Sequence, residues 1–315
     1  MIPSAFFSSE RLAALAFAIA ALVVICVGAP LDAPRAAVVA IPEGATVSSV
    51  AAELQAAGAL HYPEMFSLLV RIDGGQVVAG SYGLEENENA FALAWRFSHG
   101  QSGLVPVKVT FPEGTSVREM AAILAHALGN SFDAEKFIAL ASPDEGYLFP
   151  DTYFFLPGAT PESVITQMKT TFDTRIASAT SAIAASGRSE TDIITMASIL
   201  EKEARQDDTR RIVAGILWKR ISLGMPLQVD ATFGYIFATS TFSPSVADLK
   251  VDSPYNTYLH TGLPPGPIDN PGLQSIIDAA TPTQTPYLYY VTDHAGNIYY
   301  AKTLDQHIQN IRNAR

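Results

Sequence analysis

A 14-residue segment occurs twice in this chain, and the repeat limits the folds that the sequence can adopt. Residues 41–54 align without gaps with residues 111–124, and seven of the 14 positions are identical. Each copy places β-forming residues before a Pro-Glu-Gly turn and a Thr or Ser that can cap a helix after it. Two copies are too few for a solenoid. The repeat therefore predicts a strand–turn–helix unit that is used twice in a small mixed module.

Length and charge restrict the function. The 315 residues suggest two domains, at roughly 100–200 residues per domain. The 31 acidic and 20 basic residues give a net charge of −11, which argues against a nucleic-acid partner, because phosphate backbones need a basic surface. A single cysteine, six scattered histidines and no HExxH sequence argue against a zinc site. We therefore expect no metal and no cofactor.

The N-terminal segment is the strongest guide to the compartment. Residues 12–29 are all apolar or small, which is close to the roughly 20 residues that a membrane-spanning helix needs. A cleaved signal peptide ending at Val27–Ala29 and a lipoprotein signal at Cys26 are alternatives. We favour an uncleaved anchor, because it fits the length of the run best. All three alternatives export the remainder of the chain.

The patterns divide the chain into four predicted segments of an α+β protein. These are a short cytoplasmic N-terminus over 1–10, a transmembrane anchor over 11–30, a βα module over 31–130 that contains both repeat copies, and a mainly helical domain over 131–315. Helical spacing is clear over 163–180, 191–205 and 210–223. Two β-forming runs, 287–292 and 298–301, flank turn residues and predict a C-terminal β-hairpin.

The predicted helix over 191–205 carries the first candidate for catalysis. Apolar residues recur at i, i+3, i+4 and i+7 from Ile193, and Glu201 lies at the edge of this stripe. A carboxyl group beside an apolar wall favours its protonated form and can act as a general acid. The alternative is an exposed ion pair between Glu201 and Arg205, four residues later. The pattern alone leaves both open.

A second candidate is the alternation of polar residues after Leu227. If the segment is extended, Gln228, Asp230 and Thr232 share one face and line a groove that hydrogen-bonds a sugar. An ordinary surface strand with a capping aspartate explains the pattern equally well.

Two further segments carry polar and aromatic residues suited to a sugar. The loop over 253–267 contains four prolines, and its Tyr255, Asn256 and Tyr258 suit stacking and hydrogen bonding. Glu145 opens an aromatic-rich segment. A buried structural corner explains the aromatic residues of that segment better than it explains Glu145.

Together these segments resemble the endolytic murein transglycosylase family, also called YceG-like. The resemblance rests on residues 145–153, 197–203, 227–230, 255–258, 261–266 and 287–293, which occur in the family's order. It covers nearly the whole chain, including the N-terminal anchor. Two departures concern the groove: Ala231 stands where proline is common, and Tyr147 stands where tryptophan is common.

The resemblance implies a lyase held in the cytoplasmic membrane by one span, with its catalytic domain on the periplasmic side. It implies cleavage of MurNAc–GlcNAc bonds within nascent peptidoglycan strands without water, leaving 1,6-anhydroMurNAc ends and limiting strand elongation. The family's catalytic glutamate corresponds to Glu201. The residues expected to bind the sugars are Glu145, Gln228, Asp230, Thr232, Tyr255, Asn256 and Tyr258.

The resemblance also implies partners. The βα module would be LysM-like and bind glycan, and peptidoglycan synthases would be protein partners. Two alternatives stay open: a hydrolytic muramidase that uses Glu145 or Asp230 as a second carboxylate, and an anchored glycan-binding protein without catalytic activity.

Overall fold

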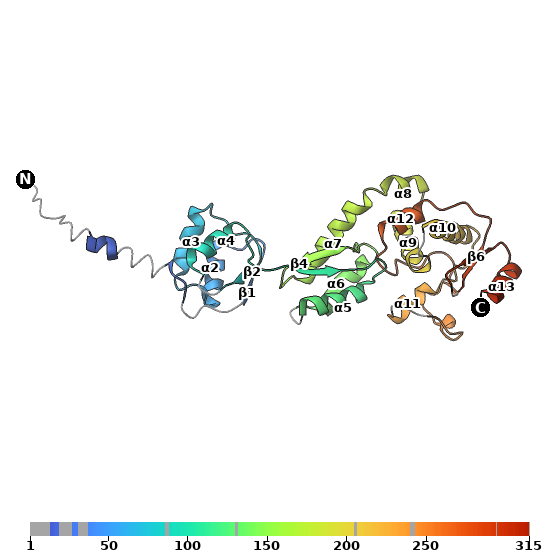
Figure 1. The fold of residues 1–315 in the computed structure, drawn as a ribbon, viewed down its shortest axis with the longest axis horizontal. Helices are drawn as coiled ribbons and strands as arrows, with labels where there is room; N and C mark the ends of the chain where they lie inside the picture. Colours follow the sequence, from blue (N-terminus) through green and yellow to red (C-terminus); the bar gives the residue numbers. More distant parts are fainter. Residues whose placement is uncertain are drawn as a thin grey trace, which may run out of the picture. The chain divides into compact units, whose positions relative to one another are not determined.

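The computed structural model describes residues 13–18, 27–30, 37–85, 88–129, 132–204, 207–239, 243–293 and 295–314 (Figure 1). The chain divides into two compact units: unit 1 runs to Val107 and includes Phe155–Ala159, and unit 2 comprises Lys108–Phe154 and Thr160–Arg315. Half of the predicted membrane anchor, residues 11–12 and 19–26, lies outside the described residues. Within the described ranges, no helix is long and apolar enough to cross a membrane.

From Ala37 onwards, the described part of unit 1 contains two short strands and three helices. Strand β1 (Ala37–Ile41) pairs antiparallel with β2 (Gly80–Leu84), so that Val39 lies opposite Tyr82. The helices are α2 (Val47–Ala56), α3 (Pro63–Ile72) and α4 (Ala90–Ser98). Each contributes fully buried apolar side chains to one core, among them Val50, Leu54, Phe66, Val70, Leu93 and Phe97. The rings of Tyr82 and Phe97 stack with their centroids 4.0 Å apart and so join β2 to α4.

Unit 2 is mainly helical. Its first half contains β3 (Val107–Thr110), α5 (Val117–Leu128), α6 (Ala134–Ala141), a 3-10 turn (Ser142–Asp144), β4 (Thr152–Phe155), α7 (Pro161–Ile176) and α8 (Thr180–Ser186). Its second half contains α9 (Glu190–Glu203), α10 (Asp207–Ser222), α11 (Ala231–Phe237), a 3-10 turn (Asp248–Lys250), α12 (Leu273–Ala280), β5 (Tyr289–Thr292), β6 (Ile298–Ala301) and α13 (Leu304–Asn313). Strands β3 and β4 form one two-stranded sheet, and β5 and β6 form another.

Helix α9 is the central element of unit 2. The Ser189 hydroxyl caps it by accepting a hydrogen bond from the Asp192 backbone N–H at 3.1 Å. Every residue from Ile193 to Leu200 is buried, and the helix packs against α10 and α12. The burial is therefore wider than the predicted apolar stripe. At the C-terminal end of the helix, the last turn, which carries Glu201, emerges from the core.

The two repeat copies both form a strand, a turn and a helix, as predicted. Gly44 and Gly114 occupy the same place in the two turns with φ of 78° and 76°, a left-handed conformation that favours glycine. The copies lie in different units, because the first belongs to unit 1 and the second opens unit 2. This division differs from the prediction, which placed both copies in one module over 31–130. The physical reason is that α5 packs against α6, the next helix of its own unit.

The α+β class, the mainly helical second half and the C-terminal hairpin are confirmed. In the hairpin, Tyr289 pairs with Ala301 and Thr292 with Ile298. Helices α3, α6, α8 and α11 were not expected. The segment over 227–232, predicted to be extended, is not one extended strand: Gln228 has a left-handed backbone, Asp230 is in a helical conformation, and helix α11 begins at Ala231.

Candidate active site

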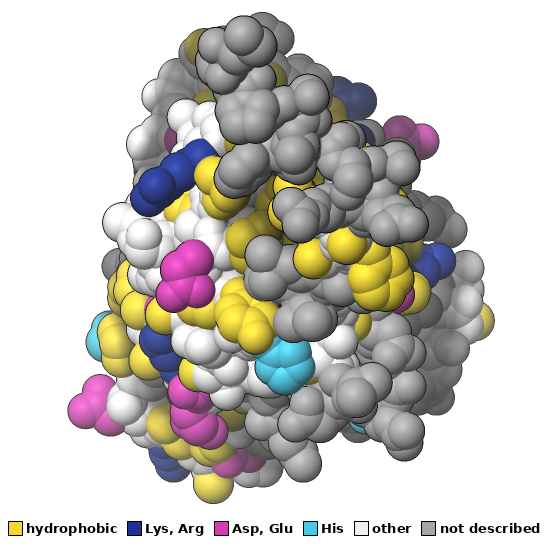
Figure 2. All heavy atoms as spheres, turned by 90° about the vertical axis from the view of Figure 1, so that its left-hand side faces the viewer, with side chains coloured by type: hydrophobic (Ala, Val, Ile, Leu, Met, Phe, Trp, Pro, Cys, Tyr) yellow, Lys and Arg dark blue, Asp and Glu magenta, His cyan; other side chains and the backbone are white. Residues whose placement is uncertain are grey.

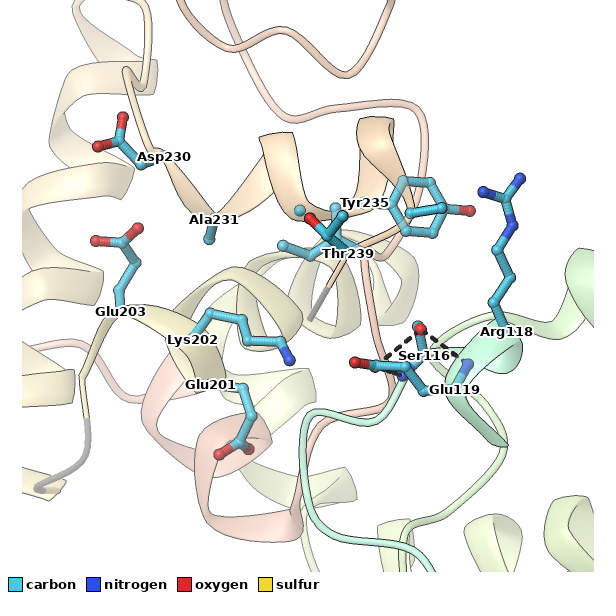
Figure 3. A pocket seen from close by; sticks show the side chains of 13 residues that line it. Ser116, Arg118, Glu119, Glu201, Lys202, Glu203, Asp230, Ala231, Tyr235 and Thr239 are labelled. Carbon is cyan, nitrogen blue, oxygen red and sulfur yellow. Dashed lines mark hydrogen bonds between the residues drawn. The ribbon is translucent and has the colours of Figure 1, made fainter. Parts of the chain in front are cut away.

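A cavity of about 450 Å³, here called the first cavity, opens at the end of α9. Its lining comes from the start of α5, the last turn of α9 and the residues of α11, with Ile268. Glu201 and Lys202 lie in the middle, Ser116 and Glu119 lie on one side, and Glu203 and Asp230 lie on the other (Figure 3). The largely buried helix α9 thus presents carboxyl groups to an open space.

Glu201 is held by a backbone group from a distant part of the sequence. Its Oε2 atom accepts a hydrogen bond from the Gly272 N–H at 2.9 Å, and Gly272 is the N-cap of α12. This contact fixes the orientation of the carboxyl group and leaves its other oxygen for a reacting group. The alternative partner, Arg205, lies outside the described residues.

A second carboxyl group, Glu113, lies beside Glu201. If Gly272 carried a Cβ atom, that atom would be 2.0 Å from Oε1 of Glu113, so the carboxyl group packs directly against this glycine. Burial raises the pKa of Glu113, and the charge of Glu201 adds to the effect. Glu113 and Glu201 therefore flank Gly272 as a pair.

Glu113 was not among the site residues predicted from the sequence, although the repeat contains it. The signal was the Glu of the Pro-Glu-Gly turn, which is identical in both copies. The same turn approaches the end of α9 closely, because a Cβ on Gly114 would be 3.1 Å from Cγ of Glu201. A left-handed glycine with no side chain is what allows the turn to lie there.

A buried carboxyl group lies beside the last turn of α9. Asp269 is fully buried, and among the described residues neither of its oxygens has a hydrogen-bond partner. Lys202 is its nearest cation, with Nζ 4.0 Å from Oδ2. Burial raises the pKa of Asp269 well above its usual range, and the charge of Lys202 opposes the shift.

A second cavity, of about 470 Å³, adjoins the first. Glu203 and Asp230 line both. The remaining lining residues of the second cavity are Arg220, Gln228, Tyr258, Tyr289, Tyr290, Val291, Thr292, Leu304, His307 and Ile311. It therefore lies between the end of α10, the hairpin and α13, and it holds three of the residues expected to bind sugar.

The two shared carboxyl groups each accept a hydrogen bond from a tyrosine. Tyr290 donates to Oε2 of Glu203 at 2.8 Å, and Tyr258 donates to Oδ1 of Asp230 at 2.6 Å. Burial raises the pKa of Glu203, while the bond from Tyr290 opposes the shift. Asp230 and Tyr258 thus meet, although they come from different segments.

Glu145 lines neither of the two cavities. Its side chain accepts hydrogen bonds from the Val117 N–H at 3.0 Å and from Nδ2 of Asn270 at 2.9 Å. Burial raises the pKa of Glu145 to about 7, although both hydrogen bonds oppose the shift. Its contacts join the first turn of α5 to the segment that precedes α12.

Three other residues expected to bind substrate have their polar groups engaged inside the protein. Thr232 is buried in α11, and its hydroxyl donates to the Val229 carbonyl at 3.1 Å. Asn256 is buried, and its amide donates to two backbone carbonyls of its own loop at 3.0 and 2.8 Å. Tyr255 packs against Tyr235 with ring centroids 4.8 Å apart. None of the three lines either cavity.

The surface and the titratable groups add two observations. The face shown in Figure 2 carries side chains of both charges among hydrophobic ones, and its described part has no continuous basic patch. Within the ranges that the structure covers, no group of three or more His, Cys, Asp or Glu side chains could hold a metal ion.

Known proteins similar to this chain include endolytic murein transglycosylases and a yceG-like protein. An endolytic murein transglycosylase of Bacillus subtilis (strain 168) is 31% identical over 85% of this chain and 81% of its own length. The enzyme of that name from Streptococcus pneumoniae (strain D39 / NCTC 7466) is 28% identical over 90% of this chain, which spans 59% of the length of that relative. The crystal structure of a yceG-like protein from Listeria monocytogenes superposes with a TM-score of 0.57 at 29% identity, covering 88% of this chain and 99% of that chain. The model of the YceG-like family matches residues 39–313, so this chain belongs to the YceG-like family.

Proposed function

We propose that this chain is an endolytic murein transglycosylase. It cleaves MurNAc–GlcNAc bonds within nascent peptidoglycan strands, leaves 1,6-anhydroMurNAc ends and so limits strand elongation. The observation that carries the proposal is the position of Glu201, which ends the buried helix α9, lines the first cavity and is oriented by the Gly272 N–H. The family membership and the names of its relatives support the same reaction.

In the proposed reaction Glu201 acts twice. It first donates its proton to the glycosidic oxygen, and the bond from that oxygen to C1 of MurNAc breaks through an oxocarbenium-like state. The substrate's own N-acetyl group stabilises this state. The Glu201 carboxylate then removes the proton from the MurNAc 6-hydroxyl, whose oxygen bonds to C1. No water is consumed, and Glu201 regains its proton, as a group that serves as both acid and base must.

A hydrolytic muramidase is the second candidate, and Glu113 is the observation that favours it. Most glycosidases use two carboxyl groups on either side of the scissile bond, and Glu113 and Glu201 flank Gly272. Glu113 replaces Glu145 and Asp230 as the second group to test in that mechanism. The two reactions differ by one molecule of water in the product.

The expected substrate-binding residues divide into two roles. Gln228, Asp230 and Tyr258 line the second cavity, and we propose that they contact the sugars. Glu145, Thr232, Tyr255 and Asn256 would act on the substrate through the segments that they hold in place.

Unit 1 is the proposed LysM-like, glycan-binding part of the chain. The side chains of Phe91 and Trp95 are 62% and 48% exposed and lie four residues apart on α4, so they share one face of the helix. The His99 ring stacks on Trp95 with centroids 4.9 Å apart. Flat aromatic groups in this arrangement suit the faces of sugar rings.

The cellular setting completes the proposal. The apolar run over 12–29 would hold the protein in the cytoplasmic membrane by one span, with both units on the periplasmic side. The enzyme would then meet strands as they leave peptidoglycan synthases, which are its proposed partners.

Mass spectrometry of the products tests the reaction. The full chain in detergent, its Glu201→Gln variant and a Glu190→Gln control are incubated with uncrosslinked peptidoglycan strands; Glu190 is an exposed glutamate at the other end of α9. We expect fragments one water lighter than hydrolysis products from the wild type and the control, and none from Glu201→Gln. Fragments of full hydrolytic mass would establish the muramidase, and an inactive wild type would refute both.

A further inference from the structure

The second cavity contains a buried arginine without an acidic partner. Arg220, in the last turn of α10, is 5% exposed, and no described carboxylate lies within ion-pair distance of it. Its Nη2 donates to Oε1 of Gln228, while its Nε is covered by protein and has no hydrogen-bond partner. Burying a guanidinium group without a counter-charge is unfavourable. A negative ligand in the cavity would supply that counter-charge.

The carboxyl groups of the same cavity are hydrogen-bonded to tyrosines and not to Arg220. Glu203 accepts the hydrogen bond of Tyr290, and Asp230 accepts that of Tyr258. Tyr289 does contact the arginine, since the guanidinium carbon lies 5.4 Å from the ring centroid. That contact orients the guanidinium group against an aromatic wall and leaves its charge unpaired.

The residue that holds Arg220 has a strained backbone. Gln228 has φ of 54°, which is uncommon for a residue with a side chain, and its N–H donates to the Thr257 carbonyl at 3.0 Å. Such strain persists where the surrounding structure requires it, and it concentrates at ligand sites. Here it places the Gln228 side chain on the guanidinium group.

The wall beside Arg220 is flat and preformed. The rings of Tyr289 and His307 stack with centroids 5.2 Å apart and 20° between their planes. Burial and the charge of Arg220 lower the pKa of His307, so the neutral imidazole is favoured. The wall therefore offers aromatic faces with no second cation, and Arg220 is the cation that lines the described part of the cavity.

We propose that the second cavity is a subsite for the side chain of a muramyl residue, in which Arg220 binds a carboxylate. This inference rests on the proposed function, and it names the part of the strand that the site selects. A planar guanidinium group matches a carboxylate with two parallel hydrogen bonds. Because the second cavity adjoins the first, a strand with its scissile bond at Glu201 would place a neighbouring muramyl side chain at Arg220.

Two sources can supply this carboxylate. In a strand without peptides it is the lactyl carboxylate of MurNAc itself, and in a strand with stem peptides it is a carboxylate of the stem. The chemistry at Arg220 is the same in both, so the substrate decides between them.

Binding to strands of defined charge tests the proposal. The full chain carrying Glu201→Gln, in detergent, is titrated calorimetrically with peptide-free strands, with the same strands after amidation of the lactyl carboxylates, and with peptide-bearing strands before and after amidation. We expect roughly 10- to 100-fold weaker binding after amidation in at least one pair, the range for a charged hydrogen-bonded pair. Which pair responds identifies the source of the carboxylate.

Variants then assign the effect to Arg220. Adding Arg220→Gln should abolish the difference that amidation makes, whereas adding Arg312→Gln, which removes the charge of an exposed arginine on α13, should preserve it. Equal binding of charged and amidated strands by the parent chain refutes the site, and this comparison does not depend on the folding of any Arg220 variant. If charged and amidated strands bind equally but the wild type cleaves strands, the subsite at Arg220 is refuted and the proposed function stands. If amidation weakens binding but the wild type does not cleave strands, the subsite is confirmed and the proposed function is refuted.

Discussion

The buried carboxyl group of Glu145 makes the stability of unit 2 depend on pH. Burial raises its pKa to about 7 in the folded protein, against an ordinary value of 4.5. The folded state therefore keeps the proton to higher pH than the unfolded chain does. Stability from this group is fully present below about pH 4.5 and is lost as the pH rises through about 7. The difference corresponds to about 3 kcal/mol of unfolding free energy.

The Glu145→Gln variant removes this titration and keeps a group of similar shape. Its carbonyl oxygen can still accept from Val117 or Asn270, so any change in hydrogen bonding is an offset that does not vary with pH. Between pH 4 and pH 8 the unfolding free energy of the variant relative to the wild type should therefore rise by about 3 kcal/mol. Titrations of all other groups cancel in the comparison.

Urea unfolding followed by Trp218 fluorescence measures the effect. The chain has two tryptophans, and a Trp95→Phe background leaves Trp218 on α10, hydrogen-bonded to the Ala279 carbonyl at 3.0 Å, as the reporter of unit 2. Glu135→Gln, at an exposed position of α6, is the matched control and should show no such rise. A difference between Glu145→Gln and the wild type that stays constant from pH 4 to pH 8 would refute the reasoning.

Three substitutions test the packing around the site. Gly272→Ala should lower the rate of strand cleavage at least tenfold with little loss of thermal stability, because its Cβ would lie 2.0 Å from Oε1 of Glu113 and displace that flexible carboxyl group; an unchanged kcat would contradict the arrangement of the pair. Gly215→Ala should lower the unfolding free energy in urea by about 1–3 kcal/mol, because its Cβ would lie 2.0 Å from the backbone carbonyl oxygen of Thr283. An unchanged urea midpoint of unfolding would show that α10 does not pack against the chain at Thr283. Asp278→Ala should lower the unfolding free energy by about 3–5 kcal/mol in the same assay, because it removes the partner of the 2.7 Å ion pair of buried Arg210. A loss of unfolding free energy below about 1 kcal/mol would contradict the burial of this pair.

The local features of the site could be predicted from the sequence because they depend on neighbouring residues. The periodicity that ends at Leu200 places Glu201 at the end of the helical core, and the structure shows the helix from Glu190 to Glu203. The turn residues after Thr292 likewise predicted the hairpin, whose register the structure supplies. In both cases a few consecutive side chains determine the outcome.

The partners of Glu201 could not be predicted, because they meet only in the folded chain. Glu113, Glu201 and Gly272 come from three segments that are far apart in the sequence, and no periodicity connects them. Arg220 was overlooked for another reason. Its position in a helix is ordinary, and its significance comes from its burial and from the unusual backbone of Gln228.

Thr232 shows how a correct pattern can have a different cause. Alternation at Gln228, Asp230 and Thr232 suggested one extended face, but α11 begins at Ala231 and turns the threonine into the core. The Thr232 hydroxyl then donates to the Val229 carbonyl, which precedes the helix. A threonine hydroxyl can hydrogen-bond to a nearby backbone carbonyl, and this favours a turn or helix start over an extended strand. A short alternation of polar residues does not show which of the two conformations forms.

The repeat explains how a structural turn became part of the site. Both copies keep the glutamate and the left-handed glycine, yet Glu43 is an exposed residue of unit 1, while Glu113 packs against Gly272. The sequence of the turn therefore determines the conformation of the turn in both copies. The role of the glutamate depends on the residues that surround the turn in each unit. Placing the second copy against the end of α9 brings its carboxyl group to Glu201, and Gly114 leaves the space that this approach needs. Glu43→Gln should leave strand cleavage unchanged, because Glu43 serves only its turn. Glu113→Gln should alter the pH dependence of strand cleavage, because the charges of Glu113 and Glu201 interact.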